Sequence, residues 1–293
     1  MYGRLGAAAD VDRLAAAALD DALSLPDVVR AGLAITEGGG RRLRFTARTE
    51  SGQLTDWCHI DAYDDVPLTE VVRTGTSVAG SLHELEDRFP GVVARQRAES
   101  VAALAAIPLP GSGSPVGGIV LFYDQPQVFD AAHHRALAAR AEALADAWRE
   151  ARAHAPRRGE RIDDDVAAGA QVATTDVEAD PRAVGDARRF LRRTLADWGV
   201  DDDTADSAIL CLSEVVTNAV VHTGQPSEVR VLLEEGVLTV SVRDEGIGYS
   251  SGPSDSDPLR VHGRGLELVD ALSARWGSEV DNVGMTVWFV FVP

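Results

Sequence analysis

Lysine is absent from this sequence of 293 residues, so all 28 basic side chains are arginines. A P-loop places a lysine on the β- and γ-phosphates of its nucleotide, and a eukaryotic-type protein kinase places a strand lysine on the α- and β-phosphates. Schiff-base chemistry also needs a lysine amine. The missing lysine therefore excludes all three kinds of site.

Cysteine and long apolar runs are scarce too. The two cysteines, Cys58 and Cys211, are too few for a disulfide framework, which suits a reducing compartment. No apolar run approaches the ~20 residues that span a membrane, and we see no basic-plus-apolar signal segment. The formal net charge of −18 disfavours nucleic acid as a partner, because phosphate backbones bind clustered positive charge. We expect a cytoplasmic protein without a membrane or nucleic-acid partner.

A polar, charged stretch without hydrophobic period, residues 154–170, has the composition of a linker. We therefore predict an α+β protein of two domains, residues 1–153 and 171–293. The first domain is expected to contain helices at 8–24, 67–74, 82–98 and 130–153, and strands at 28–36, 41–48, 101–109 and 116–123. The second is expected to contain strands at 171–177, 228–234, 237–243 and 284–292, and helices that begin after Asp180 and near 204 and 264.

The predicted helix 204–223 has two faces. Apolar residues recur at three- and four-residue spacing and should pack on a sheet, whereas Glu214 and Asn218 lie one turn apart on the opposite side. A carboxylate and an amide so placed can hold a hydrated magnesium ion, which prefers oxygen ligands. A solvated helix face gives the same pattern. The apolar set is Ala205, Ile209, Leu212, Val216 and Val220, and the opposite set is Ser207, Cys211, Glu214, Asn218 and His222.

Two glycine-rich turns follow this helix in the sequence. The first, 244–248 (DEGIG), comes directly after a predicted strand. Its carboxylate can accept the N6 hydrogens of adenine, and its glycines let backbone approach a base. The second, 263–266 (GRGL), opens a helix whose free N–H groups suit a triphosphate, and its arginine can supply a cation. Each turn by itself is also common in structures without a ligand.

Together and in this order, the three elements resemble the N, G1 and G2 boxes of the GHKL (Bergerat-fold) ATPase superfamily. Residues 213–222 (SEVVTNAVVH) are similar to the N box, and the two turns are similar to G1 and G2. Residues 284–289 (GMTVWF) resemble the last strand of the family, although Met285 stands where relatives often carry a small or polar residue. The resemblance implies a Bergerat-fold α/β sandwich that binds ATP with Mg²⁺.

The resemblance also implies a role for each residue that matches a motif. Glu214 becomes the general base that activates the attacking hydroxyl, Asn218 the ligand of the magnesium ion, and Asp244 the residue that recognises adenine. The other implied ATP-binding residues are Gly246 and Gly248 beside adenine, Gly263, Arg264, Gly265 and Leu266 around the phosphates, and Thr286, which reaches adenine through water.

The short segment between the two turns, and the helix around 187–191 (ARRFL), are most similar to the anti-sigma-factor serine kinase branch of this superfamily. This implies a serine/threonine kinase that phosphorylates a STAS-domain anti-anti-sigma protein, with a sigma factor as a further candidate partner. Two alternatives stay open. One is a non-catalytic module whose ATP site gates a protein partnership. The other is a histidine kinase with an atypical acceptor, His83, His133 or His134.

From Val66 onward, the first half of the sequence resembles a GAF sensor domain. The matching segments are 72–75 (VRTG), 105–109 (AAIPL), 117–121 (GGIVL) and the helix start at Phe129-Asp130. The resemblance implies an antiparallel sheet flanked by helices that senses an unknown ligand or a protein. Both families are compatible with a homodimer.

Overall fold

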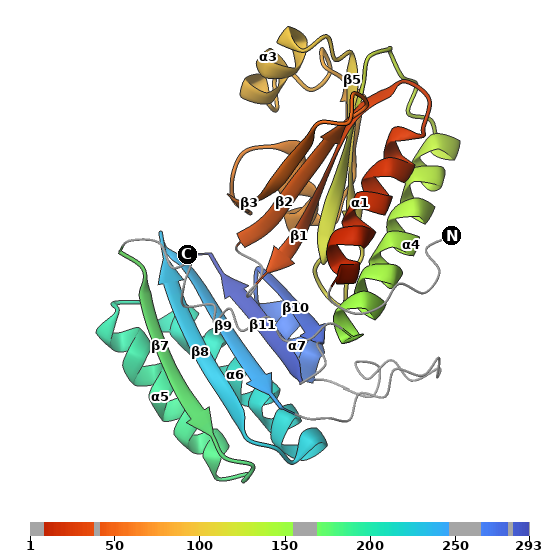
Figure 1. The fold of residues 1–293 in the computed structure, drawn as a ribbon. Coiled ribbons are helices and arrows are strands. Elements are labelled where there is room, and N and C mark those ends of the chain that lie inside the picture. Colours follow the sequence, from red (N-terminus) through yellow and green to blue (C-terminus); the bar gives the residue numbers. More distant parts are fainter. Residues whose placement is uncertain (1–8, 38–41, 155–168, 246–264, 281–283, 293) are drawn as a thin grey trace. The chain divides into compact units, whose positions relative to one another are not determined.

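The computed structural model describes residues 9–37, 42–154, 169–245, 265–280 and 284–292. The chain divides into two compact units, Met1–Ala151 and Arg152–Pro293 (Figure 1). Most of the expected linker, residues 155–168, lies outside the described residues. Each unit contains one antiparallel sheet and its own helices, so the predicted α+β fold class is confirmed.

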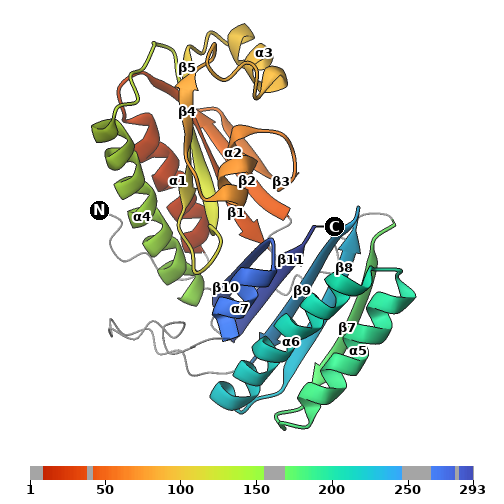
Figure 2. The same ribbon diagram turned by 180° about the vertical axis from the view of Figure 1, so that it is seen from behind.

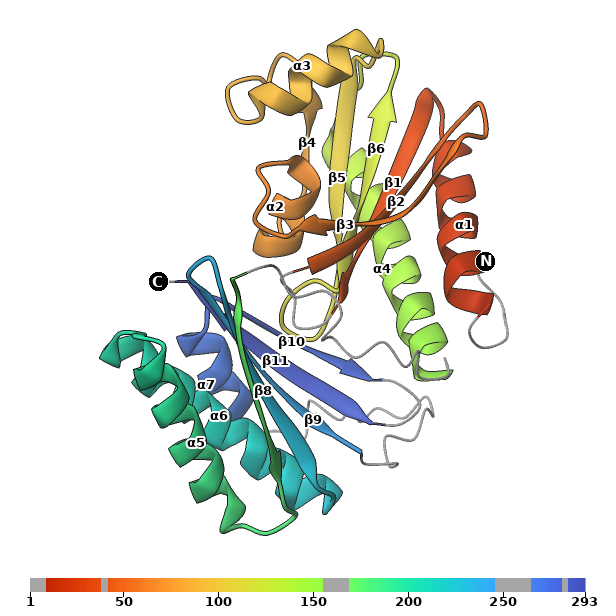
Figure 3. The ribbon, with the colours of Figure 1, turned by 60° about the vertical axis from the view of Figure 1, so that its left-hand side comes forward.

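The first unit is built on a six-stranded antiparallel sheet with the order β3-β2-β1-β6-β5-β4. Helices α1 and α4 lie side by side on one face, and α2 and α3 lie on the other (Figure 3). The strands are β1 (Val28–Glu37), β2 (Arg42–Thr49), β3 (Leu54–Asp61), β4 (Val78–Ser81), β5 (Ala103–Leu109) and β6 (Gly117–Tyr123). The helices are α1 (Ala9–Leu23), α2 (Pro67–Thr74), α3 (Pro90–Ala98) and α4 (Ala131–His154).

The central strands of this sheet are buried on both faces, which explains their nearly continuous apolar runs. Along β5, Ala105 and Ile107 belong to the core under α1 and α4, whereas Leu104 and Ala106 belong to the core under α2 and α3. Successive side chains of a strand point to opposite faces, so a strand covered on both sides needs apolar residues at every position.

Helix α3 is shorter than the helix predicted over 82–98, and this prediction was wrong for residues 82–89. The helix begins at Pro90, and Phe89 has a φ of −136° and a ψ of 58°. Proline has no N–H to continue a helix and disfavours helical backbone in the residue before it. Strands β3 and β4 were not predicted, because β4 has only four residues and β3 mixes apolar and polar residues on both of its faces.

The second unit is a two-layer sandwich. Its five-stranded antiparallel sheet has the order β10-β11-β9-β8-β7, and α5, α6 and α7 cover one face (Figure 2). The strands are β7 (Gln171–Val177), β8 (Ser227–Glu234), β9 (Val237–Asp244), β10 (Arg275–Val280) and β11 (Met285–Phe291). The helices are α5 (Ala183–Asp197), α6 (Asp202–Thr223) and α7 (Gly265–Leu272). Every predicted element is present, and β10 is additional.

Helix α6 is the central element of the helical layer. Among the described residues it alone has the length and mean hydropathy of a membrane span. However, most of its apolar residues, such as Leu212 and Val216, are buried in the core with Val229 and Val240 of the sheet, and only Leu210 and Val221 of its large apolar side chains are exposed. Packing on the sheet therefore accounts for the apolar character of this helix.

Candidate functional site

The helix that carries the predicted magnesium ligands, α6, is capped at both ends. Asp201 caps the N-terminus, where its carboxylate accepts a 2.9 Å hydrogen bond from the Thr204 N–H, and this bond lowers the pKa of Asp201. Gly224 ends the helix with a φ of +58°. Between these caps Glu214 and Asn218 are half-buried, one turn apart, outside the packed face. The helix therefore presents the predicted carboxylate and amide together.

One residue of the predicted polar face lies in the core instead. Cys211 is fully buried, because α6 is covered by the sheet on one side and is flanked by α5 and α7. Burial raises the pKa of the Cys211 thiol to about 11, and the nearby Glu214 carboxylate adds to this rise. The Glu214 carboxylate therefore lies close enough to the buried Cys211 thiol to affect its pKa.

The N-terminus of α7 lies against this face of α6. A Cβ placed on Gly265, the first residue of α7, would be 3.0 Å from Glu214 Oε2 and 3.4 Å from Asn218 Nδ2. Glycine thus permits the close approach of the two helices. The structure brings together the residues that the sequence assigned to a base, a magnesium ligand and a phosphate-binding helix start.

Leu266, which the resemblance placed at the phosphates, follows Gly265 in the first turn of α7. Its side chain is buried in the core of the second unit together with Val269. This contact anchors the first turn of α7 to the helical layer. Leu266 can therefore contribute to a phosphate site through its backbone, while its side chain is occupied by packing.

Asp244 is the last residue of β9, and its side chain is buried, with 4% exposed. It pairs across the sheet with Ser227 of β8 and with Met285 of β11. Directly opposite residues share a face, and the same face carries Val240 and Val242 of the core. The Asp244 carboxylate therefore lies on the helical side of the sheet, at the C-terminal end of β9, where the glycine-rich turn follows in the sequence.

Gly284 allows the backbone before β11 to approach the end of β9 closely. A Cβ on Gly284 would overlap the carbonyl oxygen of Asp244 and lie 3.1 Å from the Cα of Glu245. Only glycine allows β11 to start this close to the end of β9. The position of Asp244 thus depends on a residue 40 positions later in the chain.

Thr286 is not beside Asp244, contrary to the role that the resemblance implied for it. It pairs with Arg243, whose Nη1 donates a 3.1 Å hydrogen bond to the Thr286 hydroxyl. Because side chains alternate along a strand, Thr286 and Arg243 lie on the face of the sheet that the helices do not cover. The register places Met285, not Thr286, next to Asp244.

The remaining predicted residues of the site, Gly246, Gly248, Gly263 and Arg264, lie outside the described residues. Within the described part of the chain, no group of three or more His, Cys, Asp or Glu residues could hold a metal ion. The structure brings Glu214 and Asn218 together with Gly265. At the end of β9 it places Asp244 beside Ser227, a neighbour that the sequence analysis missed.

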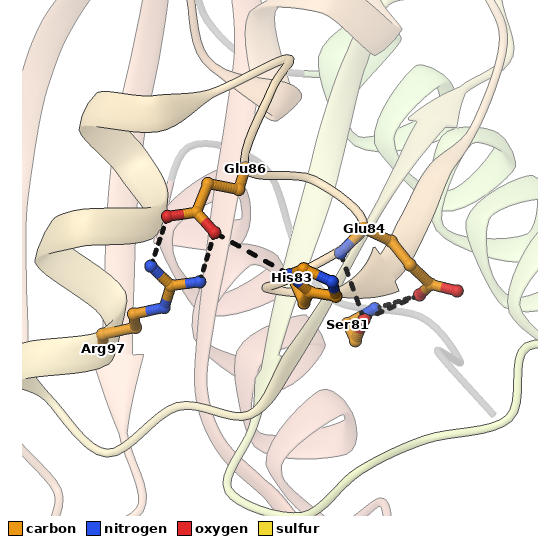
Figure 4. Close-up of polar contacts among 5 residues, drawn as sticks. All are labelled: Ser81, His83, Glu84, Glu86 and Arg97. Atoms are coloured by element: carbon orange, nitrogen blue, oxygen red, sulfur yellow. Dashed lines mark hydrogen bonds and ion pairs between the residues drawn. The ribbon is translucent and has the colours of Figure 1, made fainter.

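His83, one of the alternative phosphate acceptors, lies in a turn between β4 and α3 (Figure 4). Its side chain is 92% exposed and lies 3.9 Å from Glu86, which also binds Arg97 at 2.6 Å. Arg97 lowers the pKa of Glu86. Next to it, Glu84 accepts hydrogen bonds from the N–H (2.7 Å) and hydroxyl (2.8 Å) of Ser81, and these bonds lower its pKa. The polar residues around His83 thus stabilise a turn.

A comparison with protein families assigns the second unit. Residues 177–291 match the family model of the histidine kinase-like ATPase domain. This segment contains α5, α6, α7 and the residues around Glu214, so the second unit is similar to histidine kinase-like ATPase domains. This match supports the sequence-based prediction of a GHKL domain in this segment. A comparison with curated proteins found no match.

Solved structures similar to this chain cover its first half. The GAF domain of a two-component sensor histidine kinase from Bacillus halodurans is 13% identical, with a TM-score of 0.40, and the alignment covers 47% of this chain and 93% of that one. A type II free methionine-R-sulfoxide reductase from Thermoplasma acidophilum is 20% identical, with a TM-score of 0.36, covering 48% and 92%. The GAF domain of an Acinetobacter phosphoenolpyruvate-protein phosphotransferase is 14% identical, with a TM-score of 0.37, covering 48% and 82%.

Proposed function

We propose that the protein is a cytoplasmic serine/threonine kinase that phosphorylates a STAS-domain protein under the control of its first domain. The observation that supports this function is the approach of Gly265 to Glu214 and Asn218. It combines a carboxylate, an amide and a helix N-terminus within a domain that matches an ATPase family. The partner class, including a sigma factor, follows from the resemblance to anti-sigma-factor kinases.

The arrangement suits phosphoryl transfer. This reaction depends mainly on positioning the reactants and neutralising charge, so a short set of residues suffices. Asn218 would hold Mg²⁺ on the phosphates, and the N–H groups at the start of α7 would bind the phosphate oxygens. Glu214 would accept the proton of the attacking serine or threonine hydroxyl while the γ-phosphoryl group passes to the hydroxyl oxygen. The carboxylate is half-buried, so both solvent and a substrate side chain can reach it.

Asp244 would select the nucleotide. Its buried carboxylate can accept a hydrogen bond from the N6 amino group of adenine, whereas guanine presents an oxygen at that place. The site would therefore use a strand carboxylate for the base, an amide with Mg²⁺ and a helix terminus for the phosphates, and no lysine.

The test is to incubate the purified full-length protein with ATP, Mg²⁺ and candidate STAS-domain proteins, and to identify phosphorylated residues by mass spectrometry. We expect phosphoserine or phosphothreonine on a STAS protein. Glu214→Gln should lower transfer by about 100-fold or more while ATP binding stays nearly unchanged, because general-base catalysis contributes this much. Glu228→Gln, an exposed glutamate at the start of β8, is the matched control and should act like the wild type.

Two results would favour the alternative functions. If Glu214→Gln binds ATP normally and no partner is ever phosphorylated, the protein acts as an ATP-gated binding module. Acid-labile phosphate on His83, His133 or His134 would instead identify a histidine kinase. Either outcome contradicts the serine/threonine kinase.

A further inference from the structure

The hydroxyl of Ser227, the first residue of β8, is buried without a hydrogen-bond partner among the described residues. Only 5% of the residue is exposed. A buried hydroxyl without a partner costs free energy that the fold does not recover, and such groups are rare in native proteins. The Ser227 hydroxyl is therefore available to a ligand that reaches this end of the sheet.

Ser227 lies beside Asp244. The two residues are direct cross-strand partners in the register of β8 and β9. The next pair on the same face is Val229, two residues after Ser227, and Val242, two residues before Asp244. Both valines lie in the core beneath the helices, so Ser227 and Asp244 also face the helical side. Side chains in such a pair have Cβ atoms about 5 Å apart. A planar group that contacts the Asp244 carboxylate at this edge is within reach of the Ser227 hydroxyl.

The other neighbour of Asp244 offers no hydroxyl. Met285 pairs with Asp244 from β11, and its thioether cannot donate a hydrogen bond. The hydroxyl of Thr286 accepts a bond from Arg243 on the opposite face. Of the two residues that flank Asp244 in the sheet, only Ser227 can donate a side-chain hydrogen bond.

We infer that Ser227 is a specificity-determining residue of the nucleotide site, whose hydroxyl donates to N1 of adenine while Asp244 accepts from N6. The inference rests on the ATP site proposed above. Adenine presents an amino donor and a ring acceptor side by side on one edge. A carboxylate, which only accepts, and a hydroxyl, which can donate, match that order. Guanine presents the reverse order, with an oxygen towards Asp244 and an N–H towards Ser227.

The experiment compares the binding of three nucleotides to the full-length protein by isothermal titration calorimetry with Mg²⁺ present. ATP carries the N1 acceptor, 1-deaza-ATP replaces N1 by C–H, and 7-deaza-ATP keeps N1 but lacks another ring nitrogen. Ser227→Ala removes the hydroxyl. Thr239→Val is the matched control, because Thr239 also has a buried hydroxyl without a partner among the described residues, but on the opposite face of the sheet. Thermal unfolding of each variant without nucleotide checks the fold.

One hydrogen bond changes affinity by roughly 5-fold. We expect Ser227→Ala to weaken the binding of ATP and 7-deaza-ATP by this factor and to leave 1-deaza-ATP unchanged, while Thr239→Val binds all three like the wild type. Even without the variants, the wild type should prefer ATP to 1-deaza-ATP by a similar factor. The inference is overturned if Ser227→Ala binds ATP like the wild type, or if it loses the same factor for ATP and 1-deaza-ATP. A wild-type protein that binds none of the nucleotides would overturn the ATP site itself.

Discussion

Gly265 of α7 lies so close to Glu214 of α6 that a Cβ on the glycine would be 3.0 Å from the carboxylate oxygen Oε2. This separation is shorter than an ordinary van der Waals contact between carbon and oxygen. The two residues are 51 positions apart in the sequence, and the direct packing of α7 on α6 brings them together. The proposed general base and the proposed phosphate-binding helix start therefore form one structural site.

Gly265→Ala should impair phosphoryl transfer more than ATP binding. The new methyl group must displace the end of the flexible Glu214 side chain, while the start of α7 keeps its backbone. Because a small misplacement of a reacting group is costly, we expect a loss of transfer rate on the order of tenfold. Steady-state transfer to the partner and ATP titration measure the two effects.

Gly185→Ala provides the comparison, since it adds the same methyl group near the start of α5, where the only atom within 4 Å among the described residues is Arg189 Nη1 at 3.5 Å. It should leave both transfer and ATP binding unchanged. An equal loss of ATP affinity and transfer rate in Gly265→Ala would show that Glu214 is not the group affected.

Gly284→Ala should destabilise the second unit and weaken ATP binding together. The added Cβ would collide with the backbone carbonyl of Asp244, and backbone cannot rotate away as a side chain can. Overpacking of this kind costs roughly 1–3 kcal/mol. Urea unfolding and ATP titration are the measurements. Gly91→Ala on the exposed surface of α3 should instead match the wild type or be slightly more stable, because its Cβ would meet no atom of the described residues within 4 Å. Normal stability of Gly284→Ala would contradict the close pairing of β9 and β11.

Cys211 should make the folded state less stable at alkaline pH. Its pKa is raised from 9.0 to about 11, so between these pH values the folded chain keeps a proton that the unfolded chain has lost. Stability from this group is complete below pH 9 and is lost as the pH rises through 11, by roughly 2 kcal/mol in all. Urea unfolding at pH 8, 9, 10 and 11 should show this decline.

Cys211→Ala should remove that part of the alkaline decline, whereas Cys58→Ala, at an exposed thiol, should keep it. Other groups, such as Tyr123, whose burial raises its pKa to about 12, act equally in all three proteins and cancel in the comparison. If Cys211→Ala shows the same dependence on pH as the wild type, the thiol is not the group responsible.

The sequence was most informative where local rules act alone. Asp201 before α6 and Gly224 after it limit the helix to about the range that its apolar period predicts, because caps and periodicity are properties of neighbouring residues. Elements without a local signal were missed. β10 (RWGSEV) is held in the sheet by its pairing with β11, and neither its apolar content nor its alternation would indicate a strand in isolation.

The sequence by itself determined that no lysine serves a phosphate and that Glu214 and Asn218 share a face of one helix, because composition and helical spacing need no tertiary contact. Only the tertiary structure decided which distant residues meet them. The packing of α7 on α6 places Gly265 at Glu214, and the register of three strands places Ser227 and Met285, in preference to Thr286, beside Asp244. A shift of one residue in a strand reverses the face of every side chain, and that register is set by pairing across the sheet.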